Sequence, residues 1–196
     1  IGQKGRGFAE NGSRRVSASV ASTSCSSFAY SARPLMKERI SGTSATVADV
    51  PLILQFIRDL AEYERVLHEV EATEADVRRD LFGENPRCFC DIAEHEGKAV
   101  GFALWFYNYS TFRGRAGIYL EDLFVLPEAR GVGAGKALLC RLAQRCVEAD
   151  LGRLEWAVLN WNQPPIEFYD SLGASEKNDW TVRRLDGEAL ERLASS

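Results

Sequence analysis

Residues 118–136 read Ile118-Tyr-Leu-Glu-Asp-Leu-Phe-Val-Leu-Pro-Glu-Ala-Arg-Gly-Val-Gly-Ala-Gly-Lys136. The stretch begins as an apolar strand, turns at Pro127 and continues into a glycine-rich loop that opens a helix. A helix N-terminus reached through glycines presents backbone N–H groups that have no partner within the helix, and such groups bind anions. Glu121 and Asp122 add two carboxylates to the strand. The stretch therefore predicts a strand–loop–helix unit that holds an anion near two acids.

The spacing of the glycines excludes the two common nucleotide-binding loops. A P-loop needs four residues between its first glycine and its Gly-Lys pair, followed by Ser or Thr. Here three residues separate Gly131 from Gly135, and Ala137 occupies the hydroxyl position. A Rossmann fingerprint needs G-x-G-x-x-G, whereas here the third glycine comes one residue early. The remaining pattern, Arg130-x-x-Gly133-x-Gly135, is similar to the loop with which the GNAT superfamily of acyl-CoA-dependent N-acetyltransferases holds the coenzyme A pyrophosphate.

The composition is that of a globular protein with a core of its own. The chain has 196 residues, of which 45% are hydrophobic, and no apolar run reaches the roughly 20 residues of a membrane-spanning helix. Residues 1–41 carry seven basic and two acidic side chains, whereas the remaining residues carry 17 and 26. Because this larger part is acidic and has no basic stripe, we expect neither nucleic acid nor a membrane as a partner. A cationic substrate fits better.

The five cysteines form no paired framework, and an odd number of them indicates a reducing compartment. Cys88, Cys90 and His95 are candidate metal ligands, but no second cluster completes a set of four. We therefore expect no metal site.

Residues 1–41 differ in kind from the rest of the chain. They are rich in Ser, Gly, Ala and Arg and have no helical or strand period, which predicts disorder. Two explanations stay open: the native start is Met36, or residues 1–35 are an organelle transit peptide. We expect a cytoplasmic protein, with an organelle as the alternative if the transit peptide is real. Residues 42–196 form one domain in either case.

Hydrophobic periodicity along residues 42–196 predicts two helices, an antiparallel meander and then alternating helices and strands. Thr73 is the expected cap of the second helix, and Gly152 is the expected C-cap of the helix after the glycine loop. The next strand returns through a helical crossover, so it lies parallel to the strand that ends at Val125. The fold class is therefore α/β, with a mixed, mostly antiparallel sheet flanked by helices and one splayed pair of parallel strands. The expected helices span residues 48–68, 73–82, 137–147, 164–172 and 187–193, and the expected strands span residues 88–94, 99–109, 117–125, 154–158 and 180–185.

Four motifs carry a more specific resemblance. They are Leu60-Ala-Glu-Tyr-Glu64, Tyr119-Leu-Glu-Asp122, Arg130-Gly-Val-Gly-Ala-Gly135, and Trp161-Asn162 followed by Phe168-Tyr169. Together they resemble the spermidine/spermine acetyltransferase family, in particular its bacterial and diamine- or thialysine-type members. The resemblance covers about residues 44–193. It implies a GNAT fold, acetyl-CoA as co-substrate, a small-molecule amine as acceptor and a homodimer.

The resemblance also implies roles for individual residues. Glu121 corresponds to the catalytic glutamate that acts through water as the base, and Tyr169 to the tyrosine that protonates the leaving thiolate. Asp122 corresponds to an acid placed near the amine, and Tyr63 and Glu64 to one edge of the amine site. The implied contacts to coenzyme A are Phe124, Val125, Asn162 and the loop residues Arg130, Gly131, Val132, Gly133, Ala134, Gly135 and Lys136.

Two features leave the substrate and the base open. Ser110-Thr-Phe112 replaces the Asp-Pro-Trp of human-type polyamine enzymes, which removes one acidic contact for a long polyamine and favours a shorter amine. Glu121 and Asp122 are neighbours on a strand, so their side chains point to opposite faces unless the strand is bulged. The sequence does not decide which of them is the base. It also does not decide whether the amine is a diamine, a polyamine, ornithine or a lysine analogue.

Two other functions stand as alternatives. A non-catalytic acyl-CoA-binding sensor would use the same fold, although the intact Glu121 and Tyr169 argue against it. A protein or peptide amine acetyltransferase would need an open groove, whereas the acidic region over residues 59–84 favours a small cation.

Overall fold

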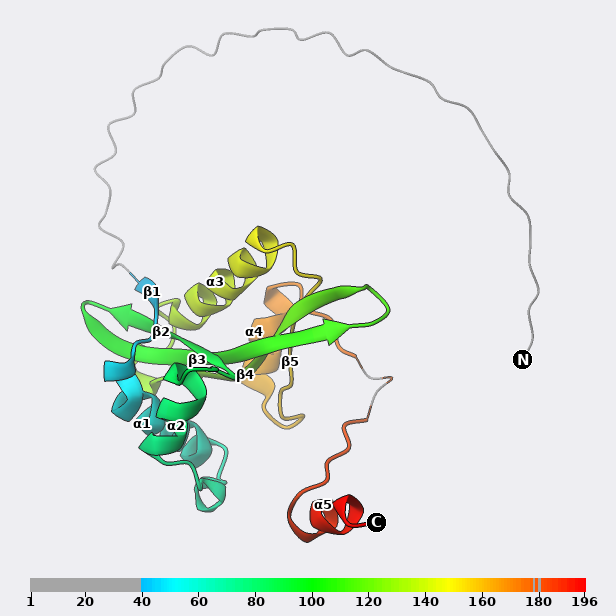
Figure 1. Cartoon of the computed structure of the whole chain (residues 1–196). Helices are drawn as coiled ribbons and strands as arrows, with labels where there is room; N and C mark the ends of the chain where they lie inside the picture. The colour runs from blue at the N-terminus through cyan, green and yellow to red at the C-terminus, as the bar shows by residue number, and fades with distance from the viewer. Residues whose placement is uncertain (1–39, 178, 180) are drawn as a thin grey trace, which may run out of the picture. The chain divides into compact units, whose positions relative to one another are not determined.

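A five-stranded sheet forms the centre of the protein, whose computed structural model describes residues 40–177, 179 and 181–196 (Figure 1). The strands follow the order β1-β2-β3-β4-β5. All neighbours are antiparallel except β4 and β5, which are parallel. The predicted mixed, mostly antiparallel sheet with one parallel pair is thus confirmed. The strands are β1 (Ile40–Ser44), β2 (Phe89–His95), β3 (Lys98–Ser110), β4 (Arg115–Val125) and β5 (Leu154–Trp156).

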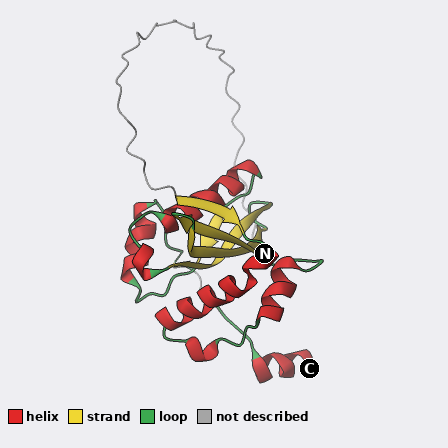
Figure 2. Cartoon of the chain, turned by 90° about the vertical axis from the view of Figure 1, so that its left-hand side faces the viewer, coloured by secondary structure: helices red, strands yellow, loops and turns green. Residues whose placement is uncertain are grey.

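Helices cover both faces of the sheet (Figures 1 and 2). On one face the third helix buries Leu138 and Leu142 completely, together with Ile118 of β4. On the other face Phe56 of the first helix stacks on Phe102 of β3 with ring centroids 5.6 Å apart. Each such buried side chain contributes about 1.5–3 kcal/mol, so the two cores fix the sheet from both sides. The helices are α1 (Val50–Tyr63), α2 (Glu74–Phe82), α3 (Ala134–Glu148), α4 (Gln163–Ser171) and α5 (Gly187–Ala194), with short 3-10 helices η1 (Val47–Asp49), η2 (Leu67–Glu69) and η3 (Pro127–Ala129).

The sequence does not predict β1. Its residues Ile-Ser-Gly-Thr-Ser are mostly polar, and the strand is defined by pairing with β2, where Ser44 lies opposite Asp91. An edge strand of this composition has little hydrophobic periodicity to recognise. β1 begins at Ile40, so the disorder expected for residues 1–41 is wrong at residues 40 and 41, and the rest of that expectation, residues 1–39, lies outside the described residues.

The helix predicted over residues 48–68 is shorter than expected. It begins with η1, continues as α1 and ends at Tyr63. Arg65 adopts a left-handed conformation with φ of 66°, and the N–H of Val66 donates to the carbonyl of Ala61 at 2.8 Å. A residue in this conformation at the end of a helix is usually glycine. The α-helix therefore does not continue to residue 68, and residues 67–69 form the separate 3-10 helix η2.

The prediction that Gly152 caps α3 is wrong. Asp150 has a φ of 50°, and the N–H of Leu151 donates to the carbonyl of Cys146 at 2.8 Å, which ends the helix earlier. Gly152 instead donates from its N–H to the carbonyl of Ala116 at 2.7 Å. The predicted cap of α2 is confirmed, since the Thr73 side chain accepts from the Asp76 N–H and Asp76 reciprocates.

The strand predicted over residues 180–185 is wrong in its described part, and Trp180 lies outside the described residues. Residues 181–186 form neither helix nor strand, and Val182 is 84% exposed. Alternating apolar residues suit a sheet, but a strand forms only where a neighbour supplies backbone partners. The helix predicted over residues 187–193 is confirmed as α5. No helix in the described part of the chain combines the length and apolar character needed to cross a membrane.

Candidate active site

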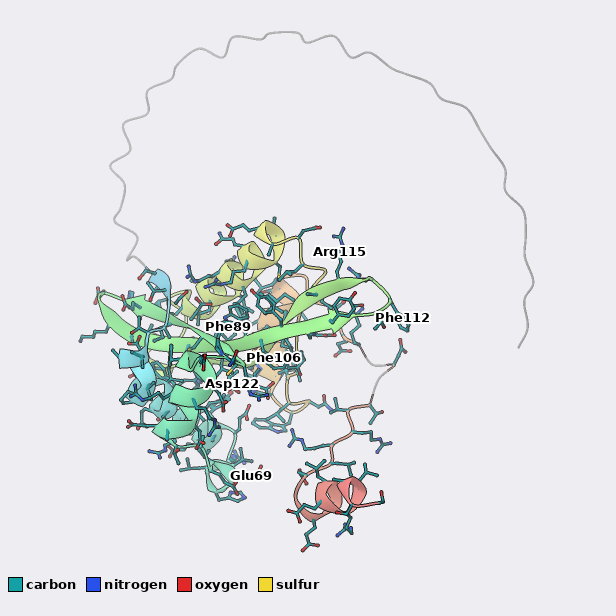
Figure 3. The ribbon with its side chains drawn as sticks, viewed as in Figure 1. Glu69, Phe89, Phe106, Phe112, Arg115 and Asp122 are labelled. Carbon is teal, nitrogen blue, oxygen red and sulfur yellow. The ribbon has the colours of Figure 1, made fainter. Side chains whose placement is uncertain are left out.

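A cavity of about 930 Å³ lies at the carboxyl end of β4, beside the start of α3 and α4. It opens because β4 and β5 separate: their pairing ends with Leu120 opposite Trp156, and β4 continues to Val125 beyond it. The splayed parallel pair expected from the sequence is therefore present. Figure 3 labels Asp122 in this part of the sheet. Every expected site residue lines the cavity except Val132, whose side chain is 39% exposed.

A β-bulge at Glu121 brings both strand acids to the cavity. In the ladder between β3 and β4, Leu104 pairs with Asp122, and its neighbour Trp105 pairs with Leu120. Glu121 is thus the extra residue of the bulge, and the alternation of faces is interrupted there. Side chains that a regular strand would send to opposite faces therefore both line the same cavity.

Three carboxylates line the cavity: Glu64, Glu121 and Asp122. The pKa of Asp122 is raised to about 7, first by burial and then by the charges of Glu121 and Glu64. Burial also raises the pKa of Glu64. Because burial and the neighbouring negative charges disfavour the ionised form of Asp122, a cation entering beside it is favoured.

Tyr169 enters the cavity from α4 with a protonated hydroxyl. Its ring packs 5.0 Å from Trp156 and 5.4 Å from Phe168, measured between centroids. The pKa of Tyr169 is raised to about 12, first by burial and then by the charge of Glu64. A phenol with a raised pKa keeps its proton at neutral pH, so it is available as a hydrogen-bond donor or proton donor in the cavity.

The glycine loop leaves the start of α3 open to a ligand. Gly131 and Gly133 have φ of 84° and 99°, values that favour glycine. Gly133 is the N-cap of α3 and supplies no capping side chain, so the first N–H groups of the helix face the cavity lined by Ala134, Gly135 and Lys136. These backbone N–H groups, together with the cationic side chains of Arg130 and Lys136, suit the diphosphate of coenzyme A.

Four expected site residues are joined in a way that the sequence does not reveal. The Arg130 guanidinium lies over the Tyr63 ring, with Cζ 4.8 Å from the ring centroid. Its Nε donates to the carbonyl of Val125 at 3.2 Å. The Tyr63 hydroxyl donates to Oδ1 of Asn162 at 2.9 Å, and Asn162 is only 6% exposed.

The cavity also has an apolar wall, to whose residues the sequence motifs assign no role. It consists of Leu60, residues 157–159 after β5, and Pro164, Pro165 and Phe168 at α4. The strand predicted to reach residue 158 ends at Trp156, and the irregular segment that follows lines the cavity instead. The Pro-Pro pair at the start of α4 is the sequence signal that marks this wall.

Within the described residues, no group of three or more His, Cys, Asp or Glu side chains is arranged to hold a metal ion. Cys88, Cys90 and Cys146 are each protonated at neutral pH, since burial is the first cause that raises the pKa of every one of them.

Comparison with known proteins identifies relatives over most of the chain. A thialysine N-epsilon-acetyltransferase of Bos taurus is 38% identical over 161 residues, which cover 76% of this chain and 94% of that protein. The spermidine/spermine N(1)-acetyltransferase-like protein 1 of Homo sapiens is 37% identical over 160 residues, covering 76% of this chain and 23% of that longer protein. The resemblance inferred from the four motifs is thereby confirmed.

Solved structures and a family profile agree with these relatives. An integron cassette protein from the mobile metagenome of V. cholerae superposes with a TM-score of 0.68 at 25% identity, covering 80% of this chain and 98% of that chain. The sequence profile described as the Acetyltransferase (GNAT) family matches residues 53–174, which include most of α1, the splayed strands, the glycine loop and α4. The chain therefore belongs to the GNAT family of acetyltransferases.

Proposed function

We propose that this enzyme transfers an acetyl group from acetyl-CoA directly to the primary amine of a small cationic substrate, of the class of diamines, polyamines, ornithine and lysine analogues. The proposal rests on one cavity that contains both three carboxylates and the N-terminus of α3, which is reached through a glycine loop and has no capping side chain. The carboxylates match an ammonium group, and the loop matches the diphosphate of coenzyme A.

The coenzyme contacts follow from this arrangement. Acetyl-CoA would supply a thioester-activated acetyl group and a thiolate leaving group. The backbone of residues 131–136 would hold its diphosphate, with Arg130 and Lys136 adding positive charge. Phe124 and Val125 lie on the part of β4 that extends beyond its pairing with β5 and line the cavity, beside the proposed position of the acyl and pantetheine portions. Asn162, which directly precedes α4, is the last of the proposed coenzyme A contacts.

The carboxylates have two tasks in the reaction. A primary alkyl amine has a pKa of about 10.4, so roughly one molecule in a few thousand is neutral at pH 7. The acids must first bind the ammonium and then accept its proton. Glu121 is the proposed base, acting through water, while Asp122 and Glu64 hold the substrate's charge. Asp122 is the alternative base, because its pKa of about 7 suits proton transfer near neutral pH.

Tyr169 is the proposed proton donor to the departing thiolate. Its raised pKa keeps the phenol protonated until the carbon–sulfur bond breaks. The direct reaction then needs no covalent intermediate on the protein.

We further expect a cytoplasmic homodimer. The support for the homodimer is the resemblance to the spermidine/spermine acetyltransferase family. Molecular mass measured by light scattering checks this expectation, since a monomer at micromolar concentration would contradict it.

A panel of amines tests the proposed function and its alternatives together. Diamines, ornithine, a lysine analogue, spermidine and a peptide with a free amine are each mixed with enzyme and acetyl-CoA, and the free thiol is measured. Thiol release with small amines supports the proposal, and release with the peptide alone favours the protein-directed alternative. Binding of acetyl-CoA without thiol release in any mixture identifies a sensor.

A further inference from the structure

We propose that Tyr63 is a positioning residue for coenzyme A, acting through Arg130 and Asn162, and that it is not a contact for the amine. This inference rests on the proposed function and reassigns a residue that the resemblance places at the edge of the amine site. Two contacts support it: Arg130, which precedes the glycine loop, lies over the ring of Tyr63 at the end of α1, and Tyr63 in turn bonds to Asn162, the residue before α4.

The first contact fixes the Arg130 side chain. Its guanidinium lies 4.8 Å from the centroid of the Tyr63 ring, and its Nε donates to the carbonyl of Val125 at 3.2 Å. Within the described residues these contacts use the guanidinium face and Nε, and leave the two terminal nitrogens without a protein acceptor. Terminal guanidinium nitrogens are the donors that recognise phosphate oxygens. Tyr63 thus holds Arg130 ready beside the loop that begins at Gly131.

The second contact fixes the Tyr63 ring. Its hydroxyl donates to Oδ1 of Asn162 at 2.9 Å, and Asn162 is buried. Tyr63 is the last residue of α1, and Asn162 directly precedes α4. The bond therefore joins two elements that border the cavity and holds the ring at the angle that the guanidinium requires.

The cation over its ring makes Tyr63 an unfavourable contact for an ammonium group. Its hydroxyl donates its proton to Asn162, and one ring face already carries the Arg130 guanidinium. A second cation on that face would be repelled by the first. The neighbouring residue, Glu64, has the negative charge that an ammonium needs and contributes to the pKa of Asp122. Two adjacent residues of one motif consequently serve different ligands.

The experiment measures both ligands on the full-length protein carrying Tyr63→Leu. Binding of CoA alone is followed by titration calorimetry, and the KM for the amine is measured at saturating acetyl-CoA. Removal of the ring is expected to weaken CoA binding about two- to fivefold, the range of a cation–π contact, with the amine KM unchanged within about twofold. In an Arg130→Ala background the same substitution is expected to change CoA binding by less than about twofold, because the ring acts through Arg130.

Two further variants keep the test decisive. Tyr63→Phe retains the ring and removes only the bond to Asn162, so it folds even if the leucine variant does not, and it is expected to weaken CoA binding by a smaller factor than Tyr63→Leu. Glu64→Gln is the matched control and is expected to raise the amine KM without changing CoA binding. A rise in the amine KM with unchanged CoA binding in either Tyr63 variant overturns the inference alone. Absence of CoA binding by the unaltered protein overturns the proposed function as well.

Discussion

Glu64 and Asp122 lie in the same cavity, and the charge of Glu64 is one of the causes that raise the pKa of Asp122 to about 7, after burial and the charge of Glu121. Glu64 caps the end of α1, whereas Asp122 follows the bulge in β4. The pair brings the end of α1 to the splayed end of β4. The repulsion between the two carboxylates is reduced by the cation that we propose as substrate.

Asp122→Asn is expected to stabilise the free protein at pH 8. In the native protein Asp122 keeps its proton up to about pH 7, whereas in the unfolded chain it loses the proton near the ordinary pKa of about 3.9. Between these values the native state binds more protons, so stability falls as pH rises, and the full cost of up to about 4 kcal/mol is reached above pH 7. Urea unfolding at pH 8 and pH 5 measures the difference, which should be up to about 4 kcal/mol at pH 8 and about 1.5 kcal/mol at pH 5. Equal effects at both pH values would mean that Asp122 is not strained in the native state.

Glu121→Gln is expected to lower turnover and to move the acid limb of the rate profile to lower pH. The sign follows because removing a neighbouring negative charge makes Asp122 easier to ionise. Asp122→Asn should instead abolish the limb near pH 7. Steady-state kinetics between pH 5 and pH 9 distinguish the two. If Glu121→Gln changes the amine KM alone, Glu121 binds the substrate and the base is Asp122.

Tyr169→Phe is expected to lower turnover by about 10²- to 10⁴-fold, the usual contribution of a positioned acid, with little change in CoA affinity. The ring still packs against Trp156 and Phe168, so the fold is retained. Single-turnover kinetics and calorimetry give the two quantities. Turnover like that of the unaltered enzyme removes Tyr169 from the mechanism.

Gly135→Ala is expected to weaken CoA binding without harming the fold. A Cβ at Gly135 would lie 3.7 Å from a Val125 methyl carbon, an ordinary contact, and alanine favours a helix by up to about 1 kcal/mol. Gly133→Ala is the contrasting variant, since its φ of 99° makes any side chain strained. The first should raise the melting temperature slightly and the second should lower it, while both weaken CoA. Retained CoA affinity in Gly135→Ala would show that the ligand does not approach this backbone closely.

The sequence anticipates the elements whose chemistry is local. Glycine spacing identifies the loop before α3, and hydrophobic periodicity identifies most helices and strands. It does not anticipate β1, whose residues form a strand because β2 lies beside them, or the end of α1 at Tyr63, which depends on a left-handed arginine. Because Glu121 and Asp122 are adjacent, the sequence indicates that β4 must be bulged if both are to serve one site. The structure has this bulge, since Leu104 pairs with Asp122 and Trp105 pairs with Leu120.

The contacts among Tyr63, Arg130 and Asn162 lie beyond sequence-based inference for a different reason. The three residues are far apart in the chain, and each has a separate motif. Their distances depend on how α1, the glycine loop and α4 come together around the splayed strands. Tertiary packing decides such relationships, and no local propensity encodes them.

The most direct test of the central claim measures both products of one reaction mixture. Purified enzyme is incubated with acetyl-CoA and a short diamine, and released thiol is compared with acetylated amine quantified by mass spectrometry. The proposed direct transfer predicts equal amounts of the two products, formed in proportion to enzyme and lost in Tyr169→Phe. Tight CoA binding without acetylated product from the diamine or any other small amine would contradict the claim.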